Sequence, residues 1–239
     1  MTPATQRHPC NISELCARRR CTMSSRSRQR CCAAILITCA SAYLQPRSTK
    51  RTTALHAGRE PLLRIGHGYD IHRLDTRDEA GQPIVIAGVR FDGSEGHAPD
   101  FELGCVAHSD GDVIYHSVVD AILGALTMPD IGCLFPDNDP RLKGADSSIF
   151  MEEAYKRMTD RGYRLGNCDV TLICQKPRVN VDAVGGGLVK EKMVGNVASL
   201  LHTDVGLVNV KARTHEKVDS VGECRAIECH VVLTLERED

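Results

Sequence analysis

The sequence predicts an α+β fold, a mixed sheet covered by helices on one face. After residue 61 the hydrophobic pattern alternates between a strand-like and a helix-like period, in the order β-β-α-α-β-α-β-β. Hydrophobic residues make up 42% of the chain and aromatic residues only 4%, so we expect an aliphatic core. No apolar run is long enough to span a bilayer. The net charge of −1 suggests neither a nucleic-acid nor a membrane partner.

The first half of the folded part is expected to hold two strands and one long helix. Residues 62–72 alternate as a strand, and the polar residues 75–82 form a loop. Residues 83–91 read as a second strand, and the Gly- and acid-rich residues 92–102 as another loop. A helix should cover about 110–127 and stop before Pro129.

The second half continues with two helices and three strands. A proline- and aspartate-rich loop spans 130–140, where it could accept hydrogen bonds from a polyol or be a plain solvated turn. The remaining elements are expected as a helix at 146–161, a strand at 167–175, a helix at 182–202 that starts late because of three glycines, and strands at 205–213 and 225–235. A single sheet covered on one face leaves the other face bare, so we expect an oligomer.

The first 61 residues differ from the rest in composition. Residues 1–31 contain one acid, Glu14, and an apolar run at 32–42 ends in Ala-Ser-Ala. The following segment is basic, rich in hydroxyl groups and free of acid, as transit peptides are. We predict a signal plus transit peptide over 1–61, similar to the bipartite leaders of complex plastids, followed by a folded domain over 62–239. Met23 is an alternative start, and a disordered tail without an address is the alternative to a leader.

The strand at 62–72 carries a candidate metal site. Side chains two residues apart on a strand point to the same face, so Asp70 and His72 lie together. Gly66 and Gly68 share that face and leave room for an approaching group. The pattern therefore predicts one face that combines a carboxylate, an imidazole and open space.

A second group of polar residues lies at the start of the predicted helix. Ser109 and Asp112 have the spacing of a capping box, and Asp112, His116 and Asp120 lie on one stripe. The helix N-terminus after His108 and Ser109 should favour an anion. The opposite stripe should face the core and consists of Ile114, Val118, Ala121, Ile122 and Ala125.

Together these elements predict a three-ligand metal site made of Asp70, His72 and His116. Three protein ligands with an open position are typical of catalytic zinc. Asp112 or Asp120 would orient His116 through its second ring nitrogen. The alternative to a metal site is that the three residues have only structural roles. An Asp-x-His strand and a histidine on a helix are both common in proteins without metal.

Six motifs occur in a fixed order along residues 62–239. They are Arg64-Ile-Gly-His-Gly-Tyr-Asp-Ile-His72, Ala107-His-Ser-Asp-Gly-Asp-Val113, Asp130-Ile-Gly132, Leu134-Phe-Pro-Asp-Asn-Asp139, Lys143-Gly-Ala-Asp-Ser147 and Lys211-Ala-Arg-Thr-His-Glu-Lys217. In this order they closely resemble the 2-C-methyl-D-erythritol 2,4-cyclodiphosphate synthase family of the non-mevalonate isoprenoid pathway. The resemblance implies a lyase, active as a homotrimer of ferredoxin-like subunits with active sites between neighbours. It also implies conversion of 4-diphosphocytidyl-2-C-methyl-D-erythritol 2-phosphate to the cyclodiphosphate and CMP.

The resemblance also implies roles for individual residues. Zn²⁺ would bind Asp70, His72 and His116, and Mg²⁺ or Mn²⁺ would bind Glu216 together with the substrate diphosphate. His108 and Thr214 would be catalytic, and Ser109 would contact phosphate. The methylerythritol would be held by Asp130, Ile131, Gly132, Phe135, Asp137 and Asp139, and the cytidine by Cys174, Arg178 and Arg213. For His67, Lys143 and Asp146, structural roles are equally compatible.

The chain departs from the bacterial pattern after Lys217. Ser220 and Glu223 replace an aromatic residue and an arginine there, and Arg225 is a possible substitute. Two other functions stay open on the residues alone. A metal-dependent phosphohydrolase could use the same triad with water as the nucleophile, and a non-catalytic metal could brace an oligomer.

Overall fold

The computed structural model describes residues 60–136 and 138–238, so residues 1–59 of the predicted leader and Asp137 lie outside the described residues. The predicted boundary at residue 61 therefore stays a prediction. In the described part no helix has both the length and the apolar character needed to cross a membrane.

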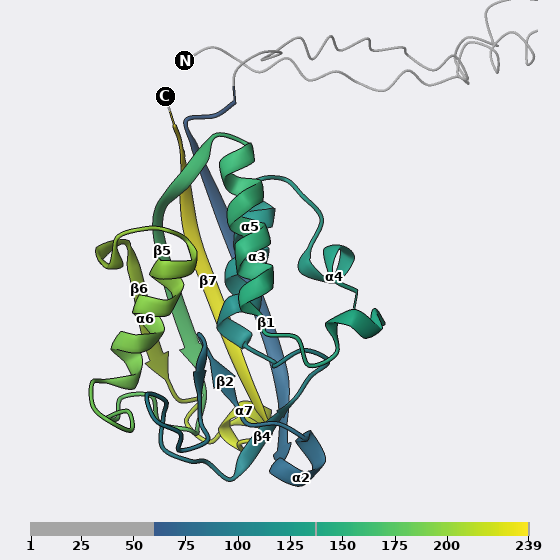
Figure 1. Ribbon diagram of the computed structural model, residues 1–239, viewed down its shortest axis with the longest axis vertical. Helices are drawn as coiled ribbons and strands as arrows, with labels where there is room; N and C mark the ends of the chain where they lie inside the picture. The colour runs from purple at the N-terminus through teal and green to yellow at the C-terminus, as the bar shows by residue number, and fades with distance from the viewer. Residues whose placement is uncertain (1–59, 137, 239) are drawn as a thin grey trace, which may run out of the picture. The chain divides into compact units, whose positions relative to one another are not determined.

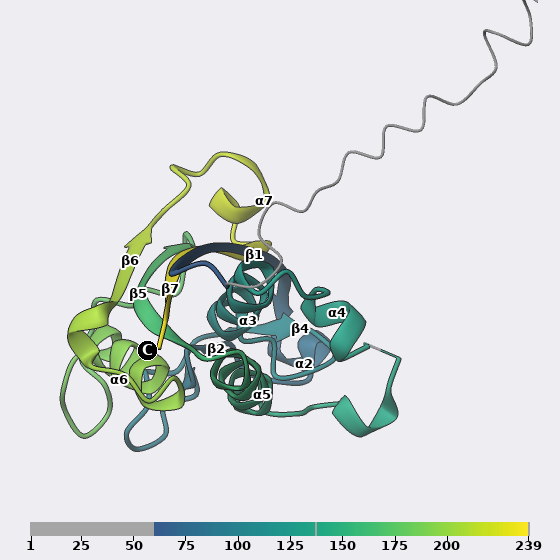
Figure 2. The ribbon, with the colours of Figure 1, turned by 90° about the horizontal axis from the view of Figure 1, so that it is seen from above.

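The core element is a five-stranded sheet in the order β4-β1-β7-β5-β6. Its strands are β1 (Leu63–Thr76), β4 (Leu103–Val106), β5 (Tyr163–Ile173), β6 (Val208–Arg213) and β7 (Ala226–Arg237). All neighbours are antiparallel except β5 and β6, which makes the sheet mixed, as predicted. The three long helices α3 (Val113–Ala125), α5 (Ser148–Asp160) and α6 (Val189–Leu200) lie on one side of it (Figures 1 and 2).

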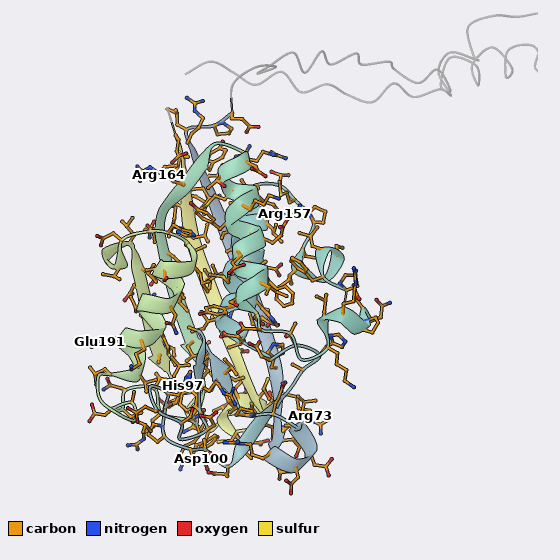
Figure 3. All side chains as sticks on the ribbon, viewed as in Figure 1. Arg73, His97, Asp100, Arg157, Arg164 and Glu191 are labelled. Carbon is orange, nitrogen blue, oxygen red and sulfur yellow. The ribbon has the colours of Figure 1, made fainter. Side chains whose placement is uncertain are left out.

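The two faces of the sheet differ in exposure. On β7, Cys229, Val231, Leu233 and Leu235 are fully buried against the helices. The opposite face exposes large apolar side chains, among them Ile65, which is 67% exposed, and Val232, which is 47% exposed. Charged groups such as Arg164 and Glu191 lie on the outside of the domain (Figure 3). The prediction of one covered and one bare face is confirmed for a single chain.

The predicted strand at 83–91 is instead a hairpin of β2 (Val85–Ile86) and β3 (Val89–Arg90). Ala87 and Gly88 have φ of 47° and 73°, which places both in the left-handed region of a tight hairpin turn. The strand β4 was not predicted, because its four residues are too short to show a period. Five further short helices were also missed: α2 (Arg77–Ala80), α4 (Ile131–Leu134), α7 (Asp219–Gly222), η1 (Pro140–Leu142) and η2 (Val205–Leu207).

Helix α3 lies unusually close to β1. A Cβ added at Gly68 would stand 1.8 Å from the carbonyl oxygen of Ser117, and one at Gly66 would stand 1.8 Å from that of Ala121. The open space predicted at these glycines is therefore filled by the backbone of α3, not by a ligand. This contact fixes the distance between β1 and α3, the two elements that carry the predicted metal ligands.

The start of α3 is set by Asp112 rather than by Ser109. Gly111 has φ of 73°, so the chain cannot be helical through 109–112, and the predicted capping box does not form. The fully buried Asp112 carboxylate accepts hydrogen bonds from the amides of Ile114 and Tyr115, both at 3.1 Å. It also accepts from Ala87 at 2.9 Å and Gly88 at 2.6 Å, and so joins the hairpin turn to the helix.

Replacing Asp112 with alanine should lower the free energy of unfolding by about 3 kcal/mol, because four amides, three of them buried, lose their acceptor. Urea unfolding followed by circular dichroism measures the change. Asp204→Ala is the control. Asp204 caps η2 and is exposed, and within the described part of the chain its carboxylate accepts a single hydrogen bond, from the amide of Gly206 at 2.7 Å. Equal losses in the two variants would contradict the role assigned to Asp112.

Candidate metal centre and adjoining cavities

The triad Asp70, His72 and His116 comes together as predicted. The Asp70 Oδ2 atom lies 3.0 Å from His116 Nδ1 and 3.2 Å from His72 Nε2, and the two ring nitrogens are 3.1 Å apart. Tetrahedral zinc, with bonds of about 2.0–2.1 Å to nitrogen, sets its ligand atoms roughly 3.3 Å apart. The three distances fit the edges of such a site, and the half-buried triad is able to hold a metal ion.

The residue that orients His116 is Ser147, not Asp112 or Asp120. The His116 Nε2 atom lies 2.9 Å from Ser147 Oγ, which donates to Asp110 Oδ1 at 2.5 Å. Asp112 caps the helix, and Asp120 accepts from the amide of Ile131 at 2.8 Å. A metal on Nδ1 requires the proton on Nε2, where it can donate to the serine. Sequence reasoning included Ser147 in a motif but gave it no role.

Two of the amides at the start of α3 are already used by a side chain of the protein. Asp112 occupies the amides of Ile114 and Tyr115, so these two are not available for an anion, and the predicted anion site at this helix end stays a prediction. The hydroxyl of Ser109 instead accepts from the amide of Gly111 and lies 3.3 Å from His116 Nε2. Ser109 therefore belongs to the surroundings of the metal centre.

The electrostatics of the triad favour a charged carboxylate. Burial opposes the charge of Asp70, but the hydrogen bond from His116 and the two neighbouring imidazoles outweigh it, so the pKa of Asp70 is lowered. Burial lowers the pKa of His72 and outweighs the attraction of Asp70. A lowered imidazole pKa keeps His72 neutral, which is the form that binds metal.

A cavity of about 280 Å³ opens beside the triad. It is lined by seven of the predicted site residues and three others: His72, His108, Ser109, His116, Ile131, Gly132 and Phe135, with Ala107, Leu142 and Phe150. The rings of Phe135 and Phe150 lie 4.5 Å apart and form an apolar wall. Phe150 was missed by sequence reasoning, since a single aromatic residue on a predicted helix reads as core.

Two predicted polyol ligands are used locally. Asp130 accepts from the amide of Cys133 at 2.8 Å and caps α4. Asp139 accepts hydrogen bonds from both the amide and the guanidinium of Arg141, and the guanidinium lowers the pKa of this carboxyl to about 2. Neither lines the cavity. Their contact with substrate stays a prediction, as does that of Asp137.

The predicted cytidine residues line a second cavity, of about 350 Å³. Cys174, Arg178, Arg213 and Thr214 all contribute to it, and it shares no lining residue with the first. The buried thiol of Cys174 has its pKa raised to about 12 by desolvation, so it is not a nucleophile. The structure thus separates the predicted site residues that line a cavity into two groups.

Glu216, the predicted ligand of the second metal, lies in the segment after β6. β6 ends at Arg213, and Glu216 has φ of 53° in an exposed turn that lines neither cavity. Glu223 accepts from Arg225 Nε at 2.8 Å. Arg225 is therefore paired in the chain.

Fold and site together define a class of protein: an α+β domain with an Asp-His-His metal centre at a small-molecule cavity. The chain belongs to the YgbB family, whose model matches residues 63–236. It is 49% identical over 209 residues to the chloroplastic 2-C-methyl-D-erythritol 2,4-cyclodiphosphate synthase of Oryza sativa, covering 83% of this chain and 86% of the relative. It is 46% identical to the synthase of Proteus mirabilis, covering 74% and 98%.

A solved structure of IspF from Plasmodium falciparum, in a CDP complex, matches with a TM-score of 0.61 and 34% identity. The match covers 76% of this chain and 100% of that one. The family resemblance found in the six motifs is thereby confirmed.

Proposed function

We propose that the chain converts 4-diphosphocytidyl-2-C-methyl-D-erythritol 2-phosphate to 2-C-methyl-D-erythritol 2,4-cyclodiphosphate with release of CMP, in the non-mevalonate isoprenoid pathway. The observation that carries the proposal is the triad of Asp70, His72 and His116, two of which, His72 and His116, line the first cavity. The family relatives bear the synthase name, and one solved neighbour is a CDP complex.

The reaction needs positioning rather than a nucleophile from the protein. An oxygen of the substrate's own 2-phosphate forms a bond to the β-phosphorus, and the bond to the α-phosphate oxygen breaks as CMP leaves. Holding the two ends of the substrate together lowers the entropic part of the barrier. In the first cavity, Phe135 and Ile131 would pack on the carbon skeleton, and His108 and Ser109 would contact the phosphates.

Asp70, His72 and His116 would hold Zn²⁺, which as a Lewis acid would polarise a phosphate oxygen when bound. Mg²⁺ or Mn²⁺ would rest on the Glu216 carboxylate and on substrate oxygens, the ligands that hard cations prefer. His108 and the hydroxyl of Thr214 would donate hydrogen bonds to the phosphates where charge builds up.

We further propose that the active site is shared between subunits of a homotrimer, each ferredoxin-like in fold. Two observations support this. The metal cavity and the cavity at Arg213 and Thr214 share no residue within one chain. The sheet also exposes Ile65, Tyr69, Ile71 and Val232 on its uncovered face, which burial in an oligomer would stabilise.

The place of action would be a plastid, reached through a signal plus transit peptide within residues 1–61. The rice relative is chloroplastic, and this supports a plastid location. The composition of the segment favours the further step of a complex plastid.

Removing metal with a chelator should reduce CMP release by the full chain at least about 100-fold, and zinc should restore it. Phosphorus NMR of the product decides the reaction type. A cyclic diphosphate supports the proposal. The hydrolysed, open-chain phosphates would instead identify a metal-dependent phosphohydrolase.

A further inference from the structure

A carboxylate outside the triad lies at the end of a hydrogen-bond chain that starts from one of the triad's imidazoles. The hydroxyl of the fully buried Ser147 lies 2.9 Å from His116 Nε2 and donates to Asp110 Oδ1 at 2.5 Å. The amide of Ser147 donates to the other carboxylate oxygen, Asp110 Oδ2, at 3.1 Å. Asp110 therefore holds the serine by both its backbone and its side chain.

The direction of the protons along this chain follows from the groups themselves. A carboxylate only accepts hydrogen bonds, so the single hydroxyl proton of Ser147 points to Asp110. The serine oxygen then has only lone pairs left for His116 Nε2, which must supply the proton of the 2.9 Å contact. A neutral His116 with its proton on Nε2 has its lone pair on Nδ1, the atom 3.0 Å from Asp70 Oδ2. The form of His116 that this chain favours is thus the one that binds a metal.

The backbone brings Asp110 to Ser147 without help from the carboxylate. The amide of Asp110 donates to the carbonyl of Ala145 at 3.0 Å, and the amide of Gly144 donates to the carbonyl of His108 at 2.7 Å. Asp110 does not line the metal cavity, but a separate cavity of about 430 Å³. Its connection to the metal centre therefore runs through Ser147.

We infer that Asp110 is a positioning residue for the metal centre, acting through Ser147 on His116. It fixes the direction of the serine hydroxyl and keeps the proton of His116 on Nε2. As a carboxylate behind the imidazole, it also raises the affinity of Nδ1 for a dication. The inference deepens the proposed function, since it concerns the triad assigned to Zn²⁺. Its readouts are zinc binding and the imidazole proton, so its failure is distinguishable from a failure of the proposed reaction, which CMP release and the product test separately.

The zinc-loaded wild type gives a test that needs no substitution. NMR of the imidazole groups should find the proton of His116 on Nε2, in slow exchange with water because its acceptor, Ser147, is fully buried. A zinc-bound His116 that carries its proton on Nδ1 would overturn the inference.

Asp110→Asn tests the role of the carboxylate with little change in shape. An amide has one acceptor oxygen where the carboxylate has two, so in either orientation its NH₂ group faces a donor of Ser147. We expect zinc affinity, measured by competition with a chromophoric chelator, to fall about 10-fold, the lower end of the usual effect of such groups. The Nε2 proton of His116 in the zinc-loaded variant should resonate upfield of its wild-type position, since its acceptor is no longer polarised by a carboxylate.

The combination with Ser147→Ala shows whether Asp110 acts through the serine. Once the hydroxyl is gone, Asp110→Asn should cost no further zinc affinity, so the double variant should match Ser147→Ala alone. If the two losses multiply in the double variant, Asp110 acts on the centre by another route and the inference is wrong.

Asp120→Asn is the matched control for charge. Asp120 lies one turn after His116 on α3, and its carboxylate accepts from the amide of Ile131 at 2.8 Å. This variant removes the same negative charge near the triad without changing the hydrogen-bond chain, so the Nε2 proton of His116 should keep its wild-type position. Equal losses of zinc affinity in Asp110→Asn and Asp120→Asn, with the same imidazole signal in both, would show an effect of charge alone and overturn the inference.

Discussion

Replacing His116 with alanine should lower CMP release about a thousandfold, the largest loss of activity expected from one side chain. The substitution removes one of three groups whose metal-facing atoms lie 3.0–3.2 Å apart. Asp70 and His72 alone would not hold a dication firmly against solvent. Turnover and bound zinc are measured together on the same preparation.

Ser147→Ala is the graded control for His116→Ala. It leaves all three metal-facing atoms in place and removes only the hydroxyl 2.9 Å from His116 Nε2. We expect about a 10- to 100-fold loss of metal affinity, the usual effect of a group that orients a ligand. Sedimentation should show the same oligomeric state for wild type and both variants. If His116→Ala lost metal and assembly together, the metal would be a brace between subunits and the catalytic proposal would fail.

Replacing Gly68 with alanine should prevent folding, or lower the free energy of unfolding by more than about 4 kcal/mol. The new Cβ would stand 1.8 Å from the carbonyl oxygen of Ser117 and 2.9 Å from the amide nitrogen of Ala121. Both atoms belong to the backbone of α3, so no rotamer change can relieve the clash. Helix and strand would have to separate, which would open the core on the covered face.

Gly195→Ala is the matched control for this prediction. Gly195 lies inside α6, and no atom comes within 4 Å of a Cβ added there. Alanine favours the helix over glycine, so this variant should gain up to about 1 kcal/mol. Thermal unfolding of both variants gives the comparison. A Gly68→Ala protein that unfolds cooperatively near the wild-type midpoint would show that the close contact of α3 with β1 does not form.

Much of the metal centre was predictable because it depends on short-range periodicity. Alternation along a strand places Asp70 beside His72, and the helical period places His116 on the polar stripe of the predicted helix. The orienting group was not predictable from spacing. Ser147 reaches His116 only because the segment before α5 folds back, with the amide of Gly144 donating to the carbonyl of His108 at 2.7 Å. The nearer aspartates on α3 are held by backbone amides instead.

The sequence by itself determined the α+β class, the covered and the bare face of the sheet, the triad and the family, because each depends on residue order and local period. Only the tertiary structure decided that the backbone of α3 fills the space beside Gly66 and Gly68 and that Ser147 orients the metal ligand His116. It also decided which predicted site residues line each of the two cavities. Those features depend on distances between elements far apart in the chain. Such distances are set by the packing of α3 and α5 against the sheet, which no local pattern encodes.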